Sequence, residues 1–290
     1  MGRGPECCVA IFLALISALV YGTADFTGGI ATKRNGLTLP VVVFSQLSGW
    51  VVVVALIPVL PTSHPHLSDV WWGLASGVAG STGLMFFYRG LARGAMSIVS
   101  PVASAVSAVI PVVGGLLAGD APAALALAGV VLGVVAVGLL GTQPMASHHD
   151  ALDSPMKSFV GALCAGCGFG GFFVLLHHTS HNSGLWPLFF ARLGSATLLI
   201  TLSLARRQPI KLVRGAVRIT LIAGAIDMAA NAVYLVVSHM ALLSIIGVIV
   251  ALYPISTLVL ARFVLHERVS KIQAGALVLA GISVSMIALA

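Results

Sequence analysis

Ten apolar runs, each about as long as a bilayer is thick, constrain this chain more than any other feature. A hydrocarbon core about 30 Å thick requires roughly 20 apolar residues per helix. Strands are excluded as spanning elements because an open sheet edge would leave backbone groups unpaired in lipid. We therefore expect an all-α integral membrane protein with ten transmembrane helices, over residues 8–30, 38–60, 70–90, 95–118, 122–141, 158–178, 185–205, 216–238, 242–264 and 271–290.

The composition indicates the same class of protein. Of the 290 residues, 59% are hydrophobic and 8% are charged, whereas a soluble domain carries about 25% charged residues. The net charge of +7 comes from residues between the apolar runs, so it fits contact with lipid headgroups and not with nucleic acid. The first apolar run is longer than the hydrophobic region of a signal peptide, and we interpret it as a retained transmembrane helix.

The second half of the sequence repeats the first at a spacing of 147 residues, so that Pro40 returns as Pro187 and Ser97 as Ser244. Each copy holds five apolar runs, and an odd number of spans inverts the second copy in the bilayer. Many secondary transporters use inverted repeats to place two gates around one site at the midplane. The expected units are a first five-helix repeat over 1–141, a polar linker over 142–157 and a second five-helix repeat over 158–290.

The basic residues predict the orientation in the membrane. Thirteen of the fifteen Lys and Arg residues lie in or beside odd-numbered loops. Since cytoplasmic loops are enriched in Lys and Arg, the face with these loops is expected to be cytoplasmic, and both termini then point outward. Trp71, Trp72 and Trp186 gather on the opposite face, which is typical of an interfacial aromatic belt.

Three ionisable residues lie well inside apolar runs, namely Asp25, Arg192 and Asp227. A charged side chain at the bilayer centre costs roughly 2.5–3.5 kcal/mol on insertion scales, and such residues usually have a function. In one interpretation, Arg192 and Asp227 form a buried ion pair that holds two helices together. In the other, at least one carboxylate faces an aqueous cavity and exchanges a proton. Asp25 is then the candidate proton-coupling residue, because its own half has no arginine at comparable depth.

Further polar and aromatic residues are predicted to line or support a cavity. Asn231 and Tyr234 follow Asp227 by four and seven residues, which places all three on one helix face. Gln46 lies 146 residues before Arg192, so the two halves differ where a substrate would meet them. Arg192 suits a substrate carboxylate, with internal pairing as the alternative. The candidate cavity residues are Tyr21, Gln46, Arg192, Asp227, Asn231, Tyr234 and Tyr253.

Three prolines inside apolar runs are candidates for helix kinks or gates: Pro101, Pro111 and Pro254. Each removes a backbone hydrogen bond and favours a kink. Interrupted helices at related places in both halves point to a transport site, although proline is also frequent in membrane helices in general.

Nothing in the sequence predicts catalysis, a cofactor or a bound metal. The phosphate-loop, HExxH and GxSxG motifs are absent. Cys164 and Cys167 form a CxxC inside a Gly-rich apolar run, which favours helix packing over redox chemistry or metal binding. His177, His178 and His181 lie at the mouth of a loop, and we expect them to be solvated at the membrane interface.

Several motifs resemble those of a known family, the EamA branch of the drug/metabolite transporter superfamily, whose members contain two EamA repeats and ten helices. Residues 88–101 (YRGLARGAMSIVSP) resemble the link between the third and fourth helices of such a repeat. Residues 252–254 (LYP) and 265–270 (LHERVS) are similar to the late-repeat signature, and residues 21–29 and 224–231 resemble one bacterial subgroup. Asp120 stands where the first repeat would carry glutamate, as Glu267 does in the second. We expect both residues to cap helices or to pair with arginine. Family members are usually drawn with both termini in the cytoplasm, opposite to the orientation that the basic residues predict.

The sequence and the resemblance together predict a multi-pass secondary active transporter of the cell (plasma or inner) membrane. It would move small metabolites or drug-like solutes by alternating access, most simply as proton-coupled efflux. The alternatives are a lipid-intermediate flippase and a non-transporting membrane sensor or assembly protein; an enzyme is not expected. The expected partners are a small-molecule substrate and the lipid bilayer, without nucleic acid, and a homodimer is a further expectation.

Overall fold

A computed structural model describes residues 5–59, 64–92, 96–140, 155–207, 209–264 and 270–290. These residues form helices joined by short connections, and no strand occurs among them. The helices are α1 (Pro5–Asn35), α2 (Thr38–Leu56), the 3-10 helix η1 (Ile57–Val59), α3 (Leu67–Ala92), α4 (Met96–Leu117), α5 (Ala124–Leu140), α6 (Pro155–His177), α7 (Trp186–Arg206), α8 (Arg214–Ser238), α9 (Leu243–Val250), α10 (Pro254–Val264) and α11 (Lys271–Ala288).

Turn residues set the ends of several helices. Helix α1 ends at Asn35 because Gly36 adopts a φ of +74°, a left-handed conformation that glycine reaches without strain. Helix α11 begins with a capping box, in which Ser270 accepts from the backbone of Gln273 and the Gln273 side chain accepts in return. A left-handed glycine therefore sets the end of α1, and a capping box sets the start of α11.

The ninth apolar run is divided into two helices. Helix α9 ends at Val250, and α10 begins at Pro254 after a turn that contains Tyr253. Proline is well suited to the start of a helix because it has no N–H to leave unpaired. The predicted interruption at Pro254 is thus present. Pro101 and Pro111, by contrast, lie within the continuous helix α4.

Within the described residues, seven segments are long and apolar enough to cross a membrane: α1, α2, α6, α7, α8, the segment Leu243–Val264 that contains α9 and α10, and α11. Helix α3 is not among these segments and carries several glycine and hydroxyl residues in its middle. The apolar stretches Val102–Leu117 in α4 and Ala124–Leu140 in α5 are shorter than a full span. The chain is therefore a multi-pass membrane protein, and the inverted ten-span arrangement remains a prediction.

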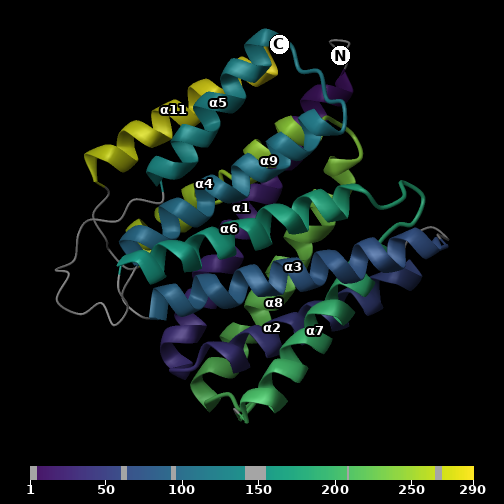
Figure 1. Cartoon of the computed structure of the whole chain (residues 1–290), viewed down its shortest axis with the longest axis vertical. Coiled ribbons are helices and arrows are strands. Elements are labelled where there is room, and N and C mark those ends of the chain that lie inside the picture. Colours follow the sequence, from purple (N-terminus) through teal and green to yellow (C-terminus); the bar gives the residue numbers. More distant parts are fainter. Residues whose placement is uncertain (1–4, 60–63, 93–95, 141–154, 208, 265–269) are drawn as a thin grey trace.

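Helices from the two halves of the chain pack against each other. Figure 1 shows α5 beside α11 at one edge of the array and α2 beside α7 at the other, and both pairs are in contact, as are α4 and α9. Contacts of the two halves also correspond, since α1 packs on α8 as α6 packs on α3, and α2 packs on α8 as α7 packs on α3. Equivalent helices of the two predicted repeats therefore have corresponding neighbours.

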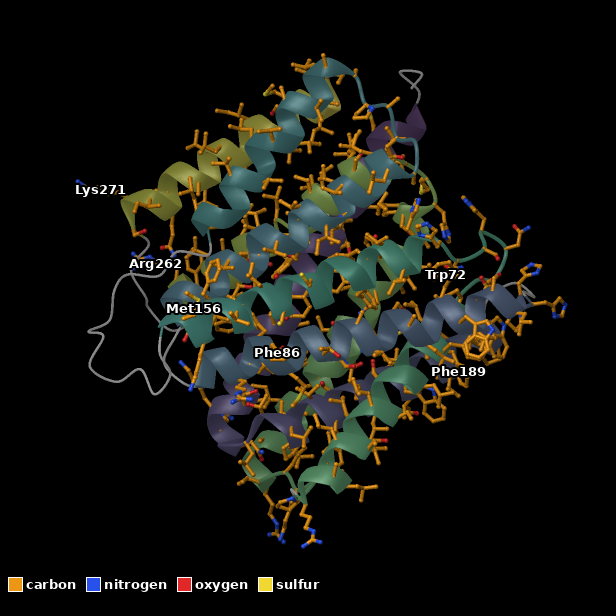
Figure 2. All side chains as sticks on the ribbon, viewed as in Figure 1. Trp72, Phe86, Met156, Phe189, Arg262 and Lys271 are labelled. Carbon is orange, nitrogen blue, oxygen red and sulfur yellow. The ribbon has the colours of Figure 1, made fainter. Side chains whose placement is uncertain are left out.

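The two ends of the helix array differ in chemistry. Arg262 and Lys271 lie at one end, whereas Trp72 and Phe189 lie at the other (Figure 2). Both termini are drawn away from the end that carries Lys271 (Figure 1). The separation of basic and aromatic residues matches the pattern that the sequence predicts for the two membrane faces.

One carboxylate links the two halves near the aromatic end. Asp120, just after α4, accepts a 2.8 Å hydrogen bond from the backbone N–H of Ser244 in the first turn of α9. A carboxylate at a helix N-terminus satisfies an otherwise unpaired N–H and interacts favourably with the helix dipole. The expected capping role of Asp120 is confirmed, while Glu267 lies outside the described residues.

Helices α1 and α10 cross with their backbones in close contact at Gly22. A Cβ there would overlap the Ser256 hydroxyl and the Tyr253 carbonyl oxygen, whereas a Cβ at Gly29 in the same helix would meet nothing within 4 Å. We expect Gly22→Val to destabilise the protein by about 1–3 kcal/mol through overpacking, and Gly29→Val to change stability much less. Thermal unfolding of both variants in detergent checks this, and similar melting temperatures would contradict the packing described.

Candidate functional site

A cavity lies between the two halves of the chain, among α1, α2, α3, α6, α7, α8 and the turn between α9 and α10. It encloses about 70 Å³ of free space, enough for several water molecules or part of a small solute. Its lining residues are Tyr21, Asp25, Gln46, Gly77, Gly80, Ser81, Leu84, Phe169, Phe172, Phe173, Leu188, Ala191, Arg192, Ser195, Asp227, Asn231 and Tyr253. The structure therefore brings together Asp25 and six of the seven predicted cavity residues.

An ion pair forms the centre of the polar side of this cavity. The Arg192 guanidinium donates to the Asp227 carboxylate at 2.5 Å and also donates to the side-chain oxygen of Gln46. The Arg192 side chain is 7% exposed and that of Asp227 is 27% exposed. The predicted pairing of Arg192 with Asp227 is confirmed. Gln46 occupies nearly the position in the first repeat that Arg192 occupies in the second, and it accepts a hydrogen bond from Arg192 directly.

Two further residues extend this network toward α1. The Asn231 amide nitrogen donates to an Asp227 carboxylate oxygen at 3.1 Å, and Tyr21 donates from its hydroxyl to the Asn231 side-chain oxygen at 3.0 Å. The network therefore runs from α2 through α7 and α8 to α1. It positions Asp227 so that its negative charge faces both a cation and an amide donor.

Asp25 lies on the same cavity but outside the network. It is one helical turn after Tyr21 in α1 and lines the cavity, yet its carboxylate receives no hydrogen bond or ion pair from any residue that the structure describes. The cavity thus contains two carboxylates in different settings: Asp227 is paired with Arg192, whereas Asp25 has no counter-ion within the part of the chain that the structure describes.

Part of the cavity lining is aromatic. Phe169, Phe172 and Phe173 project from one face of α6, and the Phe173 ring meets that of Tyr21 edge to face with centroids 5.8 Å apart. Sequence reasoning did not single out these phenylalanines. Their spacing of three and four residues on one helix face is the signal that could have identified them.

Tyr234 does not line the cavity, unlike the other predicted residues. It is fully buried, and its hydroxyl donates to the backbone oxygen of Phe173 at 2.9 Å. Although it shares a helix face with Asp227, it lies two turns further along α8 and packs behind the aromatic wall. Tyr234 supports the position of Phe173 instead of meeting the cavity.

Tyr253 reaches the cavity from the broken ninth run. Its hydroxyl is buried, lies near Ser104 and Ser107 of α4, and makes no hydrogen bond of standard geometry among the described residues. The interruption before Pro254 is therefore directly next to the cavity. Pro111 lies elsewhere in α4, packed against Gly247 of α9.

The histidines at the aromatic end form a partly buried group. His178 and His181 are exposed, as expected for solvated residues, but His177 at the end of α6 is half-buried, and the expectation of solvation is wrong for it. His181 stacks on His239, just after α8, with ring centroids 4.3 Å apart. Burial and the neighbouring His181 and His177 lower the pKa of His239 to about 4, so this imidazole is neutral near pH 7. No cluster with the geometry of a metal site occurs among the described residues.

Comparisons with known proteins support the resemblance noted in the sequence. Residues 156–289 match the family described as the EamA-like transporter family, which confirms the resemblance for the second half of the chain. No curated protein matches the sequence. A solved structure titled "Crystal structure of protein" matches with a TM-score of 0.75 and 15% identity, over 97% of this chain and 98% of that one. That likeness shows the fold of the whole chain.

Proposed function

From the match of residues 156–289 to the EamA-like transporter family, we propose that the chain is a proton-coupled secondary transporter that exports small metabolites or drug-like solutes. The match supports a membrane transporter of the drug/metabolite type. The mechanism, the coupling ion and the direction are our proposal.

The observation that carries the proposal is the Asp25 carboxylate, which lines the cavity without a hydrogen-bond partner among the described residues. An ionised carboxylate within a membrane is costly unless it is paired. Since no described residue pairs with Asp25 in a structural role, the cost is best explained by a role in binding a proton or a charged ligand. Asp227, by contrast, is held by Arg192 and Asn231.

The construction of the cavity supports alternating access. Its walls come from both halves, with α1, α2 and α3 facing α6, α7 and α8. If the two halves rock against each other, the same residues face first one side of the membrane and then the other. The broken segment around Tyr253 and Pro254 adjoins the cavity and provides a point at which the helix can bend.

Proton coupling follows from such a movement. Asp25 would take up a proton when the cavity opens outward and release it when the cavity opens inward, and solute would leave on the opposite half of the cycle. We propose the orientation that the basic residues predict, with the end containing Arg262 and Lys271 in the cytoplasm of the cell and both termini outside.

The test is solute transport by the purified protein in liposomes. With a mixture of labelled metabolites inside and an imposed pH gradient that is acidic outside, we expect solute loss that stops when a protonophore collapses the gradient. Protein-free liposomes are the control. Solute flux that is indifferent to the gradient would reject proton coupling, and no flux of any solute would reject the transporter assignment.

A further inference from the structure

We infer that this cavity selects organic monocations, in particular amines attached to an aromatic or apolar body, over neutral, zwitterionic and anionic solutes of the same shape. The inference rests on the proposed function, since it names the substrate class of the same cavity. It rests on the polar groups, the charges and the apolar surface that a ligand would meet in the cavity.

Most polar side chains of the cavity are already engaged within the protein. The hydroxyls of Ser81 and Ser195 both donate to the backbone oxygen of Gly77, and the hydroxyl of Tyr21 donates to Asn231. Apart from the buried Tyr253 hydroxyl, the side-chain groups of the described lining residues that make no hydrogen bond and can meet a ligand are the Asp25 carboxylate and the amide nitrogen of Gln46. A ligand can therefore gain one charge-assisted interaction, at Asp25, and one neutral interaction, at Gln46.

The charges of the cavity do not balance. Asp25 and Asp227 are acidic, and Arg192 is the basic residue among the described lining residues. Arg192 and Asp227 neutralise each other, so the cavity has a net charge of −1 when Asp25 is ionised. In a site with little water, that charge favours one positive charge, which can be a proton or a cationic ligand.

The apolar surface of the cavity favours a cation that is attached to an apolar or aromatic group. Phe169, Phe172 and Phe173 of α6 form an aromatic part of the cavity lining. Aromatic faces attract ammonium groups and bury apolar ligand surface. A ligand with an ammonium group at Asp25 and an apolar ring against α6 uses both features at once.

Anions and zwitterions fit less well because Arg192 is not free. A ligand carboxylate could bind Arg192 only by competing with Asp227 and Gln46, both of which accept hydrogen bonds from the guanidinium. A zwitterion would also leave the net charge of −1 uncompensated. The geometry thus separates amines from amino acids, although both carry an ammonium group.

The experiment is titration calorimetry of the purified chain in nanodiscs at neutral pH with ligands that share one phenyl-ethyl body. The ligands are phenethylamine (cation), 2-phenylethanol (neutral), phenylalanine (zwitterion) and 3-phenylpropionate (anion). We expect phenethylamine to bind at least about tenfold more tightly than 2-phenylethanol, corresponding to roughly 1.4 kcal/mol. Phenylalanine and 3-phenylpropionate should bind less tightly than the amine. Lowering the pH should weaken amine binding and leave alcohol binding unchanged, since protons compete with the amine for Asp25.

The matched variant is Asp25→Asn, which keeps the shape of the side chain and removes its charge. A thermal unfolding transition close to that of the unaltered protein shows that the variant is folded, while the preference for the amine over the alcohol should fall to about one. Equal binding of the amine and the alcohol by the unaltered protein, tighter binding of the anion, or no binding of the amine at millimolar concentration would overturn the inference. Gradient-driven flux without a preference for the amine would leave the proposed transporter intact and reject the cation selectivity alone.

Discussion

Asp25→Asn is expected to reduce solute flux driven by a pH gradient to the level of protein-free liposomes. Asparagine has nearly the shape of aspartate but cannot bind and release a proton, so the two half-cycles lose their coupling. The structure gives this change little reason to unfold the protein, because Asp25 makes no hydrogen bond or ion pair with a described residue that the substitution would break. The measurement is initial solute flux at a fixed gradient, normalised to the amount of folded protein in the liposomes.

Asp120→Asn is the matched control for this experiment. It makes the same chemical change at a carboxylate outside the cavity, and an asparagine oxygen can still accept the hydrogen bond from Ser244 at the start of α9. We expect gradient-driven flux to persist in this variant. Unchanged flux in Asp25→Asn would refute the assignment of the proton site. Equal loss in both variants would show that the effect of Asp25→Asn is not specific to the cavity.

The helices were predictable because the bilayer fixes their length and apolarity. Each predicted run contains a helix of similar extent except 242–264, which is divided into α9 and α10, and the breakers Gly36 and Pro254 mark a helix end and a helix start in the structure. The spacing of residues along one helix does not predict which neighbouring helix a side chain will contact. Tyr234 shares a face with Asp227, yet the aromatic residues of α6 cover it.

The candidate site was predictable where charge was unusual. Ionisable residues inside apolar runs are rare and expensive, so Asp25, Arg192 and Asp227 stand out in the sequence. The repeat spacing also related Gln46 to Arg192, which the structure places in direct contact. Phe169, Phe172 and Phe173 carry no charge that would make them stand out. The helix face that they share could meet lipid as readily as a cavity.

The Arg192–Asp227 pair is expected to respond asymmetrically when one partner is removed. Asp227→Asn leaves the Arg192 cation with Gln46 as its remaining strong acceptor, at a side chain that is 7% exposed. Removing one partner of a buried pair typically costs about 3–5 kcal/mol because the other charge is left uncompensated. Arg192→Gln instead leaves Asp227, which is 27% exposed to the cavity and still accepts a hydrogen bond from Asn231. We expect it to cost less.

Replacing both partners tests whether the pair itself is stabilising. In the double variant Arg192→Gln with Asp227→Asn, no charge is left alone, so its melting temperature in detergent should lie above that of Asp227→Asn. A double-mutant cycle built from thermal or denaturant unfolding measures the coupling. Equal destabilisation by the two single variants would contradict the difference in exposure on which this argument depends. If the destabilisation of the double variant equals the sum of the two single effects, the two residues act independently and the pair is not stabilising.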